Sequence, residues 1–182
     1  MKEETTMGPT ATLVFTAVAW GSLLVITAVF IYGIIEAVLN PGLAVGAVLV
    51  DVYWPFPPYF AQPVPYFSVA CVALFYSGLR LSAKMISRWP ASLLSVLQLF
   101  GFIVAFSSAY EVLYNFMLWG ASYSVACATA IASHAACNPG NIISLYPVPW
   151  NLVFATRTFS ALFVISGYSV YFLRKLTGSG FI

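Results

Sequence analysis

The chain has 182 residues, of which 62% are hydrophobic and 7% are charged, whereas a soluble domain carries about a quarter charged residues. Its mean hydropathy of +0.94 exceeds what a water-soluble globule can bury, so the composition predicts an integral membrane protein. The formal net charge is +2, and no run of four or more basic residues occurs. Binding to nucleic acid or to a lipid surface through a polybasic segment therefore has no basis in the sequence.

Four apolar segments are long enough to cross a membrane as helices, and we expect them to form one membrane domain over 1–182. The first segment ends at Asn40-Pro41-Gly42, a sequence typical of a helix end, and is too long for the core of a cleavable signal peptide. The predicted fold class is all-α, a polytopic integral membrane protein with four transmembrane helices in a bundle. The expected spans are 11–39, 65–86, 90–119 and 149–173.

Two longer connections, 40–64 and 120–148, join these spans on one side of the membrane. A run rich in proline and aromatic residues, 54–67, predicts a polyproline-like or turn-rich backbone, either as a structural cap or as a docking surface. Residues 42–52 before it predict an interfacial helix or an extended stretch. In the second connection, 121–137 competes as a fifth span, but it leaves no room for a turn after the third, and we favour a re-entrant or surface helix.

The basic residues indicate an orientation. By the positive-inside rule, the side that carries them is cytoplasmic, so we expect a multi-pass protein with both termini in the cytoplasm. Six of the seven basic residues agree with this assignment: Lys2, Arg80, Lys84, Arg88, Arg174 and Lys175. Arg80 and Lys84 lie in the last turns of the second span, where their stems are expected to extend toward the headgroups.

Two opposite charges fall inside predicted spans at matching depth. Glu111 lies eight residues before Trp119, and Arg157 lies eight residues after Pro149, which places each about 12 Å from the outer boundary. Because an isolated charge is costly there, we expect an ion pair between Glu111 and Arg157 that faces the bundle interior. The pair is either a structural staple or part of a site for a proton, a cation or a small polar ligand. The expected intramembrane polar site comprises Glu111, Arg157, Glu36, Asn115 and Ser107.

The second connection holds Cys127, His134 and Cys137, which include the only histidine of the chain. On one unbroken helix these three side chains share a stripe that resembles a soft metal site, but the spacing matches no standard zinc motif and a fourth ligand is missing. A disulfide between Cys127 and Cys137 requires a bend, because ten helical residues separate them by about 15 Å. The disulfide, the metal site and two unpaired thiols stay open as alternatives, and no metal or cofactor is assigned.

Motifs of catalysis are absent from the sequence. It contains no Walker loop, no dinucleotide fingerprint and no nucleophile elbow, so we expect no enzyme and no cofactor. We expect a non-catalytic subunit of a larger membrane assembly that packs through its apolar helices and outer loops. Its expected partners are the lipid bilayer and other membrane protein subunits or copies of itself. The alternative is a small oligomeric transporter or channel that uses the intramembrane Glu/Arg site.

Overall fold

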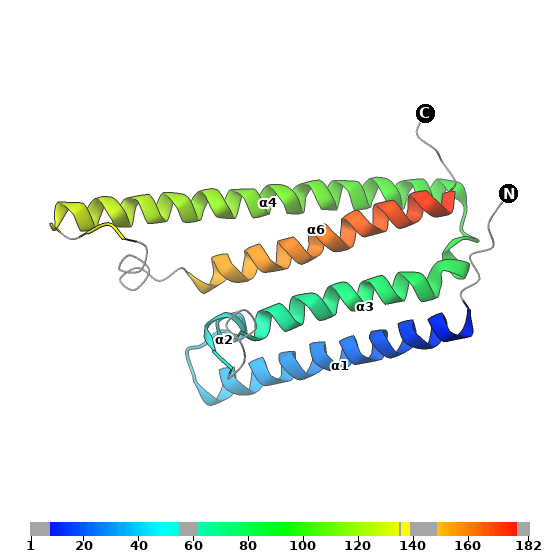
Figure 1. Ribbon diagram of the computed structural model, residues 1–182, viewed down its shortest axis with the longest axis horizontal. Coiled ribbons are helices and arrows are strands. Elements are labelled where there is room, and N and C mark those ends of the chain that lie inside the picture. The colour runs from blue at the N-terminus through cyan, green and yellow to red at the C-terminus, as the bar shows by residue number, and fades with distance from the viewer. Residues whose placement is uncertain (1–7, 55–61, 135, 139–148, 178–182) are drawn as a thin grey trace.

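The computed structural model describes residues 8–54, 62–134, 136–138 and 149–177, and the described part contains helices and no strands. Four of its helices are long and apolar enough to cross a membrane, which confirms the four long apolar helices predicted from the sequence. A fifth helix is short. The elements are α1 (Pro9–Leu39), α2 (Val45–Asp51), α3 (Pro63–Ile86), α4 (Ala91–Ala132) and α6 (Trp150–Thr177), as Figure 1 shows.

The four long helices lie side by side in a row, in the order α4, α6, α3, α1 (Figure 1). Close backbone approaches join only neighbours in this row, so within the described residues the backbone of α4 approaches neither α3 nor α1. The helices α1 and α3 form one antiparallel hairpin and α4 and α6 form another, joined where α3 packs parallel to α6. The bundle is therefore open, and α1 and α4 form its two edges.

The close contacts between helices follow stripes of residues spaced by seven. On α4 the buried stripe comprises Leu94, Gly101, Ser108 and Asn115, because seven residues complete nearly two helical turns. Gly101 allows the backbones to approach, since a β-carbon at this position would lie 3.1 Å from Cγ2 of Val170 on α6. This contact fixes the register between α4 and α6.

The end of α4 differs from the sequence prediction. We expected the third span to end at Trp119-Gly120 and a separate surface or re-entrant helix to follow, but α4 continues without a break through 121–132. The segment after Gly120 is rich in Ala, Ser and Thr and contains no proline before Pro139, so nothing in it stops a helix. With 42 residues, α4 is about 63 Å long, twice the thickness of a hydrocarbon core.

The short helix α2 is the most deeply buried segment of the chain. Its Ala47, Val48, Leu49 and Val50 are at most 4% exposed, because α2 sits at the start of α3 between α1 and α6. Gly33 of α1 packs against Leu49, and Gly46 of α2 packs against the indole ring of Trp150 on α6. Of the two alternatives expected for 42–52, an interfacial helix or an extended stretch, the structure has a helix over Val45–Asp51, and this helix packs against three others.

Candidate functional site

Arg157 lies on the face of α6 that packs on α3. Tyr168, eleven residues further along α6, contacts the ring of Tyr76 on α3, with ring centroids 4.6 Å apart. Eleven residues make about three turns, so Arg157 is on the same face of α6 as Tyr168 and is directed toward α3. Because the two helices are parallel, Arg157 lies near the level of Pro65, in the first turn of α3.

The structure does not bring Glu111 and Arg157 together. Within the described residues there is no ion pair between them, and Nη1 of Arg157 is buried without a hydrogen-bond partner. Ser166 of α6 contacts α4 at Gly101, and Arg157 precedes Ser166 by nine residues, or about 2.5 turns. Arg157 therefore points away from α4, which carries Glu111. The matching depth that the sequence predicts for Glu111 and Arg157 is compatible with this register, but the two side chains lie on helix faces that do not point toward each other.

The other residues of the expected polar site are also dispersed. Asn115 is buried on the face of α4 that packs on α6, and its Nδ2 has no hydrogen-bond partner. Ser107 is exposed. The Glu36 carboxylate accepts a hydrogen bond of 3.1 Å from Asn40 Nδ2 at the end of α1. These residues do not form one pocket, and their function stays a prediction.

A double-mutant cycle tests the separation of Glu111 and Arg157. We expect the effects of Glu111→Gln and Arg157→Met on the free energy of unfolding to add within about 0.5 kcal/mol, because the residues share no contact. The measurement is unfolding of each single variant and the double variant in one detergent. A coupling energy of several kcal/mol would contradict the geometry and would support an ion pair between Glu111 and Arg157.

A cluster around Arg80 was not anticipated from the sequence. Arg80 donates a hydrogen bond of 3.4 Å to the hydroxyl of Tyr76, one turn deeper in α3, and its guanidinium lies 5.5 Å from the centroid of that ring. The Tyr168 ring packs on Tyr76 from α6. Arg80 therefore contacts the Tyr76 ring at the edge of the α3–α6 interface, and its expected extension toward the headgroups stays a prediction. The spacing of four between Tyr76 and Arg80 was the available signal.

Cys127 and Cys137 form a disulfide, with their α-carbons 5.1 Å apart. The bend that this bond requires begins where α4 ends, at Ser133, and His134 adopts a left-handed conformation with φ of 61°. Because the thiols are joined, Cys127, His134 and Cys137 do not form the stripe of metal ligands that an unbroken helix would present. Among the described residues, no group of three His, Cys, Asp or Glu side chains is placed to hold a metal ion.

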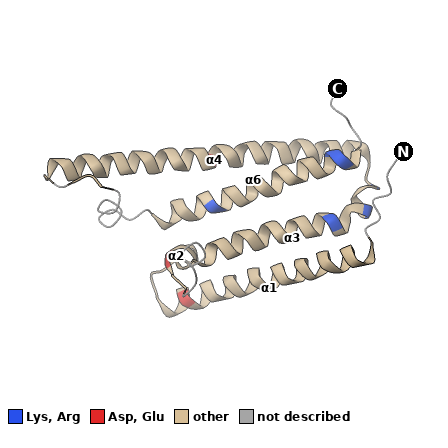
Figure 2. Cartoon of the chain, in the orientation of Figure 1, with Lys and Arg blue, Asp and Glu red and all other residues tan. Residues whose placement is uncertain are grey.

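Apart from Glu111, which lies in the middle of α4, the acidic and basic residues of the described chain lie mainly toward opposite ends of the row. The end at which α1 begins and α6 finishes carries the basic side chains, whereas Glu36 and Asp51 lie at the end near α2 (Figure 2). Arg157 is the exception among the described basic residues, since it lies in the half of α6 nearer to α2. The basic residues at the first end are Arg80, Lys84, Arg88, Arg174 and Lys175.

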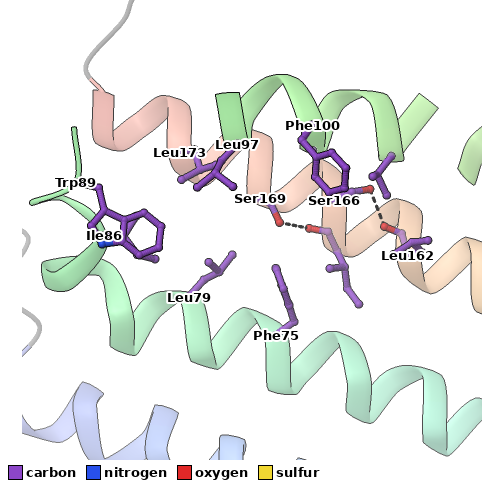
Figure 3. Close-up of a pocket in the computed structure, with 13 residues that line it drawn as sticks. Phe75, Leu79, Ile86, Trp89, Leu97, Phe100, Leu162, Ser166, Ser169 and Leu173 are labelled. Carbon is purple, nitrogen blue, oxygen red and sulfur yellow. Dashed lines mark hydrogen bonds between the residues drawn. The ribbon is translucent and has the colours of Figure 1, made fainter. Parts of the chain in front are cut away.

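An apolar groove of about 320 Å³ opens between α3 and α4, with α6 as its floor (Figure 3). It exists because α3 and α4 both pack on α6 while their backbones stay apart, although Ile86 of α3 and Leu94 of α4 share one buried cluster at its end. Its polar side chains are Ser166 and Ser169, and both hydroxyls donate to carbonyls of α6, at 2.6 Å to Leu162 and 2.7 Å to Ile165. Apart from the indole of Trp89, the groove therefore presents no polar side chain beyond these two serines, and no charged residue lines it.

No protein-family model, curated protein sequence or solved structure matches this chain.

Proposed function

We propose that this chain is a multi-pass membrane protein and a non-catalytic subunit of a larger membrane assembly. The placement in the membrane rests on the four apolar helices and on tryptophans near both ends of the row. Gly101 of α4 packs against Val170 and Ser166 of the antiparallel helix α6. Counting outward from this contact along both helices places Trp119 of α4 at the level of Trp150, where α6 begins. From Trp89 to Trp119 the chain rises about 45 Å, which matches a bilayer with its interfacial regions.

The assignment as a subunit rests on one observation: α4 projects beyond the level of Trp119 and Trp150. Residues 120–132 continue α4 for about 20 Å past the start of α6, so no other long helix of the described residues accompanies them. Val125 and Ile131 on this projection are 68% and 61% exposed. A single helix with large exposed apolar side chains outside the bilayer is expected to be covered by another polypeptide. The open row has two helical edges, α1 and α4, that can receive such a partner.

The alternative of a small transporter or channel has less support. A path lined by Glu111 and Arg157 requires that both face one cavity, whereas they lie on different faces of the α4–α6 pair. The groove between α3 and α4 is apolar and offers no site for an ion. A non-catalytic role fits the same observations, because the described carboxylates and the only histidine lie apart from one another.

Photo-crosslinking tests the assignment as a subunit. A photoreactive phenylalanine at Val125 should capture a second polypeptide in native membranes, because this position lies on the projecting end of α4. The matched control is Phe106, which is equally exposed but lies in the middle of α4, where lipid is expected. Capture of no polypeptide from Val125, with an intact fold, would argue against the proposal.

The basic end of the row is proposed to be cytoplasmic, with both termini on that side. Single cysteines near Arg88 and near Arg174 should be protected from a membrane-impermeant thiol reagent added to intact cells. Cysteines near Gln62 and Asn138 should react with it. Labelling near Arg174 from outside would reverse this orientation.

A further inference from the structure

The apolar groove between α3 and α4 has the depth of one leaflet of a bilayer. The residues that line it fall within 75–86 of α3 and 162–173 of α6, so the groove is about 16 Å long. Trp89, in the turn between α3 and α4, lines its end at the level assigned to the membrane interface (Figure 3). Because a hydrocarbon core is about 30 Å thick, the groove begins at this interface and ends near the middle of the bilayer.

The walls of the groove are apolar, and the chain itself leaves them uncovered. Phe100 of α4 is 63% exposed and Phe75 of α3 is 39% exposed. On the floor, the hydroxyls of Ser166 and Ser169 already donate to carbonyls of α6, so they require no hydrogen bond from a ligand. The surface of the groove therefore matches a hydrocarbon.

The dimensions of the groove favour a flexible chain over a helix. A transmembrane helix crosses both leaflets and is at least about 10 Å across, which requires a cross-section of about 80 Å². The groove has a volume of about 320 Å³. Spread over a length of about 16 Å, this volume gives a mean cross-section of about 20 Å². One acyl chain of a lipid in this leaflet fits both the length and the width.

The end of the groove at Trp89 lies at the basic end of the row (Figure 2). Arg88 directly precedes Trp89, and its side chain is exposed, so its guanidinium is accessible to a headgroup. The acidic residues of the described chain all lie elsewhere, in the middle of α4 or at the α2 end. Glu3 and Glu4 precede α1, the helix that is farthest from α4 in the row. The charge at this end of the groove therefore favours an anionic headgroup.

We propose that the groove binds one acyl chain of an anionic phospholipid in the leaflet at the basic end, with the phosphate of that lipid at Arg88. A guanidinium donates two parallel hydrogen bonds to phosphate oxygens. The indole of Trp89 lies between the headgroup and the chain, as is typical of tryptophan at a membrane interface. The site rests on the proposed placement in the membrane but not on the role as a subunit.

Native mass spectrometry tests the headgroup contact. The full-length protein is delipidated in detergent and titrated with phosphatidylglycerol and phosphatidylcholine that carry identical acyl chains. The wild type should retain one phosphatidylglycerol about fivefold more strongly, and Arg88→Gln should remove this preference, because one basic residue near a headgroup contributes about a factor of five. Lys84→Gln is the matched control and should keep the preference. Lys84 is also exposed, but it lies two residues from Ile86 and so on the opposite side of α3 from the groove.

A variant that fills the groove tests the position of the acyl chain. Val104 lines the groove, so Val104→Trp should occupy it and lower the retention of both lipids about tenfold through lost packing contacts. Val96→Trp is the matched control and should leave retention unchanged, because Val96 is exposed on the same helix and does not line the groove. Arg88→Gln alters an exposed side chain outside the helices, and it serves as the test if Val104→Trp does not fold.

The remaining outcomes overturn the proposal in distinguishable ways. Retention by Val104→Trp equal to that of the wild type would exclude the groove as the site. Equal retention of the two lipids by the wild type, or loss of the preference in Lys84→Gln, would exclude the contact at Arg88. Release of a copurifying polypeptide by Val104→Trp, with lipid retention unchanged, would assign the groove to a partner. A folded chain that stays in solution without detergent or lipid would refute the membrane placement itself.

Discussion

Gly46→Ala should lower the free energy of unfolding by about 1 to 3 kcal/mol, because the added methyl group has no space. A β-carbon at Gly46 would lie 2.5 Å from Cζ3 of Trp150, so the indole ring or α2 must shift. Val50 of α2 and Val64 of α3 belong to the same buried cluster, against which Trp150 packs. A shift of α2 therefore disturbs the contacts that hold α1, α3 and α6 together at this end.

Gly78→Ala is the matched control for this effect. Nothing lies within 4 Å of a β-carbon at Gly78 in α3, so this change should be neutral or stabilising by up to about 1 kcal/mol through helix propensity. Thermal and denaturant unfolding of both variants in one detergent supplies the comparison. Replacing Trp150 by Leu in the Gly46→Ala background should recover part of the loss. Equal stability of the two glycine variants would contradict the close packing of α2 on α6.

Removal of the disulfide should loosen the projecting end of α4 by about 2.5 to 3 kcal/mol, as expected for a loop of this length. The bond between Cys127 and Cys137 holds the chain after Ser133 back against α4, where Ala126 and Ala130 are buried. Without it, this end is a helix terminus that is free to fray. The effect should stay local, because 120–132 contribute little to the packing of the four long helices.

Hydrogen exchange detects this local loosening. Exchange over 120–132 should accelerate about a hundredfold in Cys127→Ala with Cys137→Ala, and should not change in α1 or α3. Cys71→Ala, which alters the unpaired thiol of α3, is the control and should leave the end of α4 protected. Unchanged exchange after removal of the bridge would show that other contacts hold this end.

The sequence predicted the long helices well because length and apolarity alone determine them. Three of the four helices begin and end within about four residues of the predicted spans. The end of α4 was missed because glycine, alanine and serine after Trp119 permit a helix without requiring one. The buried position of α2 was missed for a different reason. Its apolar residues indicate that the segment must be buried, but they do not indicate which helices bury it.

The candidate site shows the same limit. Counting from the helix ends placed Glu111 and Arg157 at one level, which the register between α4 and α6 supports. The direction of each side chain depends on how α6 is rotated between α3 and α4, and this rotation follows from the packing of whole helices. The sequence also left the state of Cys127 and Cys137 open, since the bend at Ser133 has no glycine or proline to mark it.

The mass of the native particle tests the central proposal most directly. The tagged chain, extracted from its own membrane in a mild detergent, should appear in native mass spectrometry with at least one further polypeptide in fixed stoichiometry. That partner should contact the end of α4, so a variant with Val125→Glu and Ile131→Glu should release it while Phe106→Glu retains it. A folded particle of 19.8 kDa that carries only lipid would contradict the assignment as a subunit.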